Sequence, residues 1–192
     1  MNDAFLLAGL GNPGPIYANN RHNVGFKVIE AVVDANISVE FKKMASIAQA
    51  AFFDLDKIRI IAAKPLVFMN LSGQAVRFLA DFYKIPPEKI FVFHDDIDLK
   101  FGKIKIKKGG GNGGHNGLKS IDSLLGNDYW RVRIGVGRPK EKSMVASYVL
   151  ENFSDEEQLW LQNIFREISR NIPLLLENYK QLEAKLNAVA QT

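Results

Sequence analysis

The stretch FLLAGLGNPGP fills residues 5–15 and indicates the class of fold. Its apolar first half, Phe5–Leu10, predicts a short buried strand, and the two prolines of its second half predict a loop. After this loop, apolar residues recur at helical spacing and predict a helix over about residues 23–35. A buried strand that leads through a loop into a helix is typical of proteins that alternate strands and helices.

The rest of the chain continues this alternation. The expected strands lie over 50–55, 58–63, 90–93, 103–108 and 130–136, with a glycine-rich loop over 109–114. A helix capped by Ser72 should stop before Pro86, and a short helix should cover 116–125. The capping box Ser154–Glu157 should open a further helix, which Pro173 separates from a last helix near 174–189. We therefore expect one α/β domain over residues 1–192. Its central sheet should be mixed and largely parallel, with helices on both faces and a helical C-terminus.

Composition excludes several classes of protein. The 192 residues are 47% hydrophobic and 24% charged, which is typical of soluble globular proteins, and none is cysteine. The lack of cysteine rules out disulfide scaffolds, thiol nucleophiles, thiolate zinc sites and iron–sulfur clusters. Residues 1–20 lack the basic region and cleavage site of a secretory signal, and no apolar run reaches the ~20 residues of a membrane span. These features predict a cytoplasmic protein that does not associate with membranes.

Positive charge is concentrated in one part of the chain. The net charge is +4, but the segment from Lys100 to Lys140 has ten cationic and two acidic residues, a balance of +8. Alternating cations along its two predicted strands should form one row from Lys103, Lys105 and Lys107 and another from Arg131 and Arg133. Such a segment favours a polyanionic partner such as nucleic acid, although a solvated basic surface has the same composition.

The stretch Gly9–Gly14 matches the glycine spacing of a dinucleotide-binding loop. Two observations argue against a bound dinucleotide. Pro15 follows at once and disfavours the immediate turn from strand into helix. The carboxylate that would bind the ribose should end a second strand, whereas Glu30 and Asp34 lie on a predicted helix. We therefore expect no cofactor.

Polar clusters follow several of the predicted strands, at residues 11–22, 65–70, 94–98 and 109–116. Ligands of α/β sheets bind outside the carboxyl ends of strands, so we expect these clusters to meet. His22 lies at the start of a helix, where its imidazole can project into such a cleft and take a proton from water. Either Asp95 or Asp96 can supply the carboxylate that fixes the tautomer of this imidazole.

Three asparagines, Asn12, Asn70 and Asn116, lie in three separate clusters. Asparagine is common in turns, and that role alone accounts for each of them. Their amides also offer both donors and acceptors, which suits binding of a peptide backbone or of an acyl oxyanion. Together with His22 and an aspartate, these amides can position water on a carbonyl group.

Two other functions fit parts of this pattern. His94, Asp95, Asp96 and Asp98 follow a strand and can bind Mg²⁺ or Mn²⁺, as in a metal-dependent phosphohydrolase. The basic segment alone also fits an RNA-binding module in which His22 has no catalytic role. The sequence contains neither the nucleophile elbow of serine hydrolases nor the paired histidines of zinc protease helices.

Six sequence blocks resemble the bacterial-type peptidyl-tRNA hydrolase family and occur in the family's order over nearly the whole chain. They are Gly9–Gly14, Arg21–Gly25, Phe68–Gly73, His94–Leu99, Gly109–Lys119 and Arg133–Pro139. The resemblance implies an α/β fold with a mixed sheet, no cofactor and no metal. It also implies hydrolysis of the ester that joins a peptide to the terminal ribose of tRNA, by a cytoplasmic monomer whose partner is peptidyl-tRNA.

The resemblance also assigns roles to individual side chains. His22 is expected to be the general base, Asp95 to orient it, and Asn12 to position or polarise groups at the reacting carbonyl. The residues expected to hold the peptide or line its cleft are Tyr17, Met69, Asn70, His115 and Asn116, and those expected to bind tRNA phosphates are Lys105, Lys107, Arg133 and Lys142. Two positions depart from the family pattern: Lys100 replaces a proline, and Leu66-Val67 replaces a pair that contains threonine.

Overall fold

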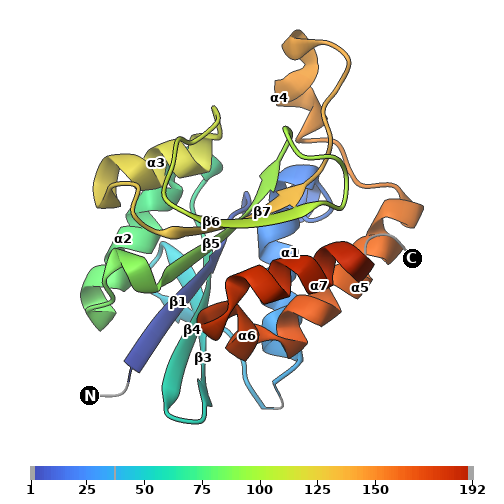
Figure 1. The fold of residues 1–192 in the computed structure, drawn as a ribbon. Coiled ribbons are helices and arrows are strands. Elements are labelled where there is room, and N and C mark those ends of the chain that lie inside the picture. Colours follow the sequence, from blue (N-terminus) through green and yellow to red (C-terminus); the bar gives the residue numbers. More distant parts are fainter. Residues whose placement is uncertain (1–2, 37, 190–192) are drawn as a thin grey trace.

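A computed structural model describes residues 3–36 and 38–189. Its strands are β1 (Asp3–Gly9), β2 (Lys42–Met44), β3 (Ala48–Leu55), β4 (Ile58–Pro65), β5 (Ile90–Asp96), β6 (Ile104–Lys108) and β7 (Trp130–Gly135). All seven belong to one sheet in the order β2-β3-β4-β1-β5-β7-β6 (Figure 1). The strand predicted from the opening stretch, β1, therefore lies at the centre of the sheet.

The centre of the sheet is parallel and its edges are antiparallel. β1 pairs in parallel with β4 and β5, and β5 pairs in parallel with β7. β2 and β3 extend one side and β6 the other, each antiparallel to its neighbour. The prediction of a mixed, largely parallel sheet is confirmed. The four parallel strands end on the same side of the molecule, where the polar clusters can meet.

Helices cover both faces of the sheet, as predicted. They are α1 (Val24–Asp34), α2 (Ser72–Tyr83), α3 (Asn116–Leu125), α4 (Val145–Tyr148), α5 (Asp155–Arg170), α6 (Ile172–Glu177) and α7 (Tyr179–Val189). α1 and α5–α7 pack on one face around Val28 and Leu161, and α2 and α3 pack on the other around Val76 and Ile121. Figure 1 shows α4 projecting from the rest of the molecule. None of the described helices is long and apolar enough to cross a membrane.

Close backbone contacts hold the start of α1 over the ends of β1 and β5. A Cβ atom on Gly9 would lie 2.1 Å from the carbonyl oxygen of Gly25, and one on Gly25 would lie 2.3 Å from that of Phe93. Neither position can therefore accept a side chain. The first glycine of the dinucleotide-like stretch serves this packing, which brings the residues just before α1 next to the end of β5.

Several boundaries differ from the predictions. β5 ends at Asp96 instead of residue 93, because the polar residues 94–96 still pair with β7. β2 was not predicted, since a strand of three residues shows no periodicity in the sequence. Ser72 does not cap α2: its hydroxyl donates to the Met69 carbonyl at 2.8 Å, and Leu71 occupies the N-cap position.

The C-terminal helices also break at a different residue. The helix predicted over 174–189 is divided at Asn178 into α6 and α7. Pro173 lies in the first turn of α6, where its missing N–H leaves no helical hydrogen bond unmade. The capping box is confirmed, because the Glu157 amide donates to the Ser154 hydroxyl at 3.2 Å and the Ser154 amide donates to the Glu157 carboxylate at 2.8 Å.

Candidate active site

His22 lies on a 3-10 turn, Arg21–Asn23, that leads directly into α1. The segment after α4 holds this turn in place. The His22 amide donates to the Val149 carbonyl at 2.8 Å, and the Arg21 guanidinium forms an ion pair with Glu157 at 3.0 Å. His22 is only 9% exposed. The histidine that the sequence singled out is therefore fixed at the carboxyl end of the sheet.

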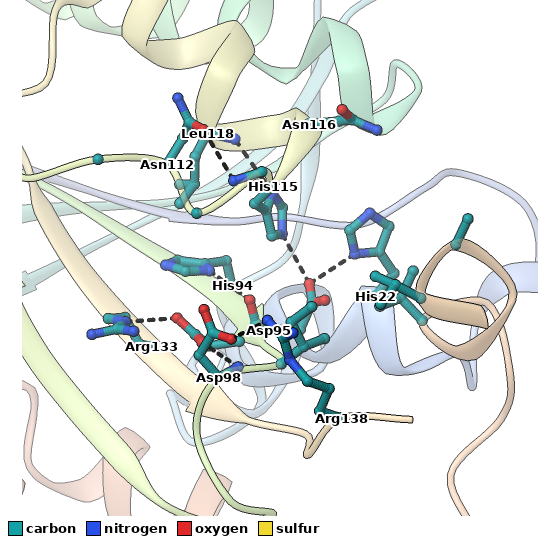
Figure 2. A pocket seen from close by; sticks show the side chains of 18 of the residues that line it. His22, His94, Asp95, Asp98, Asn112, His115, Asn116, Leu118, Arg133 and Arg138 are labelled. Carbon is teal, nitrogen blue, oxygen red and sulfur yellow. Dashed lines mark hydrogen bonds and ion pairs between the residues drawn. The ribbon is translucent and has the colours of Figure 1, made fainter. Parts of the chain in front are cut away.

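One oxygen of Asp95 contacts two imidazoles. Its Oδ1 atom lies 2.8 Å from Nδ1 of His22 and 3.0 Å from Nε2 of His115 (Figure 2). Asp95 is near the end of β5 and only 2% exposed. The polar pattern of the sequence left open whether Asp95 or Asp96 lies beside His22, and the family resemblance assigned this role to Asp95. Neighbouring residues of a strand point to opposite faces, and Asp96 pairs with Arg133 at 2.6 Å instead.

The hydrogen-bond partners determine which ring nitrogens hold protons. A carboxylate oxygen only accepts, so neutral His22 donates through Nδ1–H and keeps Nε2 as its basic atom. Nδ1 of His115 accepts from the amides of Gly117 at 3.1 Å and Leu118 at 3.4 Å, so its proton is on Nε2 and is donated to Asp95. Nε2 of His22 has no partner in the described part of the chain and is turned away from Asp95 (Figure 2).

The electrostatics of the pair favour a charged imidazole beside a charged carboxylate. Burial lowers the pKa of His22, but the Asp95 carboxylate more than offsets this effect, so the pKa lies above its ordinary value of 6.5. Burial would raise the pKa of Asp95, yet the imidazoles of His22 and His115 hold it well below its usual range. Asp95 is therefore an anion that stabilises the His22 cation.

His94 lies behind His115, with the two ring centroids 5.1 Å apart. Its Nδ1–H donates to the backbone carbonyl of Asp95 at 2.7 Å. Burial, followed by the neighbouring His115 imidazole, lowers the pKa of His94 to about 3. His94 is therefore neutral near pH 7, and its ring supports the backbone of Asp95 instead of acting as a base.

Asn12 is held by two neighbours in an orientation that leaves one amide group free. Its Oδ1 accepts from the Met69 amide at 2.8 Å, which identifies the other terminal atom as Nδ2. Its backbone exchanges two hydrogen bonds with the Asn23 side chain, both 2.9 Å long. Nδ2 of Asn12 has no protein partner among the residues that the structure describes. The loop after β1 and the loop before α2 are thus joined next to the turn that carries His22.

The other predicted peptide-site residues surround this junction. Asn70 and Asn116 are exposed, and neither side chain has a hydrogen-bond partner within residues 3–36 and 38–189. The ring of Tyr17 packs edge-on against Phe68, with centroids 6.4 Å apart. Met69 reaches the start of α3, since a Cβ atom on Gly117 would lie 2.6 Å from the Met69 sulfur. The loops that the sequence expected to meet do so.

A cavity of about 460 Å³ opens beside these groups. The predicted site residues that line it are His22, Asp95, His115, Asn116, Lys107, Arg133 and Lys142. Asn12, Tyr17, Met69, Asn70 and Lys105 lie outside its lining, the first four on the side of the Asn12–Met69 contact. The cavity therefore extends from His22 and His115 toward the cationic strands β6 and β7. The contact between Asn12 and Met69 lies outside it.

The cations of β6 and β7 are brought side by side, but they are not equivalent. Lys105 lies opposite Arg133 and Lys107 opposite Arg131. The expected row of two arginines is wrong, because Arg131 is 1% exposed and donates to Asp122 at 2.9 Å and to the Gly111 carbonyl. Burial, then Arg133 and Arg131, lower the pKa of Lys107. Lys105 is exposed, and Arg133 is half-buried beside Asp96.

The residues of the alternative metal site do not converge. Asp96 pairs with Arg133, Asp98 pairs with Arg138, and His94 directs Nδ1 at a backbone carbonyl. A different trio, His22, Asp95 and His115, has ligand atoms within 4.8 Å of one another. Nδ1 of His115 accepts from two backbone amides, however, so Nε2 of this ring carries the proton and has no lone pair for a metal. The donor set fits a hydrogen-bonded network.

Some cavity residues were not singled out in the sequence. Ser143, Val145, Ala146 and Val149 belong to the segment between β7 and α5 and line the cavity with Lys142. α4 has four residues, which is too short for a hydrophobic period to appear. The one feature of the sequence that could have predicted a contact between this segment and the turn Arg21–Asn23 is the charge of Arg21.

The chain is similar to proteins of one family over most of its length. Residues 6–192 match the family model described as peptidyl-tRNA hydrolase. A peptidyl-tRNA hydrolase of Rickettsia conorii is 50% identical over 187 residues, covering 97% of this chain and 100% of that protein. One of Rickettsia bellii is 49% identical over 177 residues, covering 91% of this chain and 94% of the relative. The crystal structure of peptidyl-tRNA hydrolase from Acinetobacter baumannii aligns with a TM-score of 0.87 at 34% identity, covering 98% of this chain and 96% of that one.

Proposed function

The chain belongs to the peptidyl-tRNA hydrolase family and hydrolyses peptidyl-tRNA, and from this premise we propose that His22 is the general base of the reaction. The observation that supports this assignment is the 2.8 Å contact between His22 Nδ1 and Asp95 Oδ1. It leaves Nε2 of His22 as the basic atom, and His22 lines the cavity of about 460 Å³. Asp95 orients the imidazole and stabilises its cation.

The chemical step needs no side chain as nucleophile. Nε2 of His22 takes a proton from water as the water oxygen attacks the ester carbonyl. Nδ2 of Asn12, whose orientation is set by Met69, is the donor we assign to the oxygen that becomes negative. The tetrahedral intermediate then expels the ribose 3′ oxygen, which receives the proton from His22. The products are a peptide carboxylate and tRNA.

Asn70 and Asn116 are the groups we assign to the peptide main chain. Both are exposed, and no protein partner competes for their amides in the described part of the chain. Tyr17, Met69 and His115 are the residues we assign to the lining of the same peptide cleft. An aminoacyl-tRNA lacks the peptide bond that these amides would bind, and it has a charged amino group in that place. An amide that the bound substrate covers without pairing to it is costly, so this arrangement selects peptidyl-tRNA over aminoacyl-tRNA.

The tRNA backbone is assigned to the cationic side of the cavity. Lys107, Arg133 and Lys142 line it, and Lys105 lies opposite Arg133 on the neighbouring strand. These cations follow the cavity away from His22, in the direction that the acceptor end must take once the ester lies at the base. We further propose that residues 1–192 form one domain that acts as a cytoplasmic monomer, without a metal or cofactor.

The test compares N-acetyl-aminoacyl-tRNA with the matching aminoacyl-tRNA, each with and without EDTA. Cleavage of the first substrate only, at a rate that EDTA does not change, is the expected result. Loss of activity in EDTA and its return with Mg²⁺ or Mn²⁺ would contradict the proposed mechanism and favour a metal-bound water. Equal cleavage of both substrates would contradict the role of the asparagines.

A further inference from the structure

We propose that His115 is a positioning residue that holds the Asp95 carboxylate in place for His22. This inference rests on the roles proposed above for His22 and Asp95. His115 reaches Asp95 from the loop before α3, whereas His22 reaches it from the turn before α1, and the centroids of the two rings lie 4.8 Å apart. Both imidazoles meet the same carboxylate oxygen, at 3.0 and 2.8 Å.

The use of histidine at this position is informative. His115 is the N-cap of α3, and its Nδ1 accepts from the amides of Gly117 and Leu118. Serine, threonine, aspartate and asparagine are the residues that usually cap helices, and they do so with a shorter side chain. None of these side chains has an N–H donor that points away from the helix while another of its atoms accepts from the helix amides. The imidazole does, and at this position its Nε2–H donates to Asp95.

Contacts around the ring prevent it from turning. The His115 backbone amide donates to the Asn112 carbonyl at 2.9 Å, and the His94 ring meets His115 nearly edge-on, at 75°. Gly117 leaves room on another side, since a Cβ atom there would lie 3.1 Å from the His115 ring. His115 therefore links the backbone of α3 to Asp95 through one fixed tautomer.

Asp95 needs such a link. Within the described residues, the only donors to its carboxylate are His22 and His115. His22 gains and loses a proton at Nε2 in each catalytic cycle, so the strength of its Nδ1–H bond to Asp95 changes although the bond itself persists. His115 uses both nitrogens within the protein and keeps the same contact whether or not His22 is protonated. We infer that α3 thereby sets the orientation of the catalytic pair.

Two variants separate this role from helix capping. His115→Asn and His115→Ser keep a side chain that caps α3 but remove the donor to Asp95. We expect kcat to fall about 10- to 100-fold, the effect of one hydrogen bond to a charged group. The loss in kcat should exceed any rise in KM for peptidyl-tRNA, and the thermal midpoint should stay close to wild type. His115→Ala removes the cap as well and should lower the thermal midpoint further.

A double-mutant cycle with Asp95→Ala is the decisive measurement. If His115 acts through Asp95, His115→Asn should change kcat by less than about threefold in the Asp95→Ala background. The full factor in both backgrounds, or a wild-type kcat for His115→Asn and His115→Ser, would overturn the inference. Asp95→Ala with unchanged kcat would overturn the proposed function as well, whereas additivity alongside a large Asp95→Ala effect would overturn only the inference.

Discussion

Nδ1 of His22 and Oδ1 of Asp95 lie 2.8 Å apart although the two residues are 73 positions apart in the chain. Two parts of the fold produce this contact. Gly9 and Gly25 let α1 approach the sheet, and β5 continues far enough to place Asp95 beside the turn that precedes α1. Both residues are largely buried, so the charge of Asp95 acts on His22 with little screening by solvent.

The first prediction is a shift of the pH–rate profile in Asp95→Asn. The base works only when unprotonated, and Asp95 holds the pKa of His22 above 6.5, so the acid limb of kcat/KM should lie above pH 6.5 in the wild type. Asp95→Asn leaves burial as the main influence, which lowers the pKa. The limb should move to lower pH while kcat falls about 10²–10⁴-fold.

The control for this prediction is Asp128→Asn, which removes an exposed carboxylate that pairs with Lys108. Its profile should match the wild type. If Asp95→Asn also left the profile unchanged, the carboxylate role would pass to Asp96 or to no residue.

The second prediction concerns the base itself. His22→Ala should reduce turnover of peptidyl-tRNA by about 10²–10⁴-fold, because the attacking water loses its proton acceptor. Affinity for tRNA should remain nearly intact, since the cationic residues are untouched, and this is measured by titration with deacylated tRNA. Near-normal turnover in a folded His22→Ala variant would remove His22 from the mechanism.

The sequence predicted the elements and the meeting of the polar loops, because strand ends and apolar periods are local properties. The pattern of residues alone could not choose between Asp95 and Asp96, and only the family resemblance assigned the role to Asp95. That choice depends on β5 continuing past residue 93, where pairing with β7 outweighs the polar character of the side chains. The contact of His115 with Asp95 could not be predicted either, since histidine is a rare helix cap and its presence does not indicate a helix start.

The burial of Arg131 is another feature that the sequence could not predict. Alternation along a strand places Arg131 and Arg133 on one face, but it does not say which neighbours cover that face. α3 supplies Asp122 to one arginine, and Asp96 of β5 pairs with the other. Only the packing of α3 on the sheet decides that Arg131 is buried.

The third prediction concerns the peptide site. Asn116→Ala should lower kcat/KM for N-acetyl-aminoacyl-tRNA about tenfold, the effect of one hydrogen bond lost at the peptide. Aminoacyl-tRNA should stay uncleaved, so the loss should be confined to the substrate that has the peptide bond. Asn127→Ala is the matched control, because Asn127 is also exposed but lies beyond the other end of α3. Equal effects of Asn116→Ala on both substrates would place Asn116 outside peptide recognition.

The fourth prediction is about stability. Arg131→Met should lower the free energy of unfolding by about 2–4 kcal/mol, because it leaves the Asp122 carboxylate without its cation in a largely buried site. Urea unfolding at pH 7 measures this change. Lys107→Met, at the position opposite Arg131, should cost less than about 1 kcal/mol. An unchanged free energy of unfolding for Arg131→Met would show that the ion pair between Arg131 and Asp122 does not stabilise the fold.

The fifth prediction separates tRNA binding from chemistry. Lys105→Ala combined with Arg133→Gln should weaken tRNA binding, raise KM for peptidyl-tRNA and flatten the log–log salt dependence of affinity by up to about one unit per lost phosphate contact. Glutamine is chosen because it can still donate to Asp96. Cleavage of a minimal peptidyl-nucleoside ester should hardly change, since that substrate lacks the phosphates.

Lys42→Ala, on the strand at the opposite edge of the sheet, is the control and should affect neither substrate. Equal losses on both substrates would place Lys105 and Arg133 in the catalytic site or the fold, and an unchanged salt slope would show that these cations only keep the surface charged.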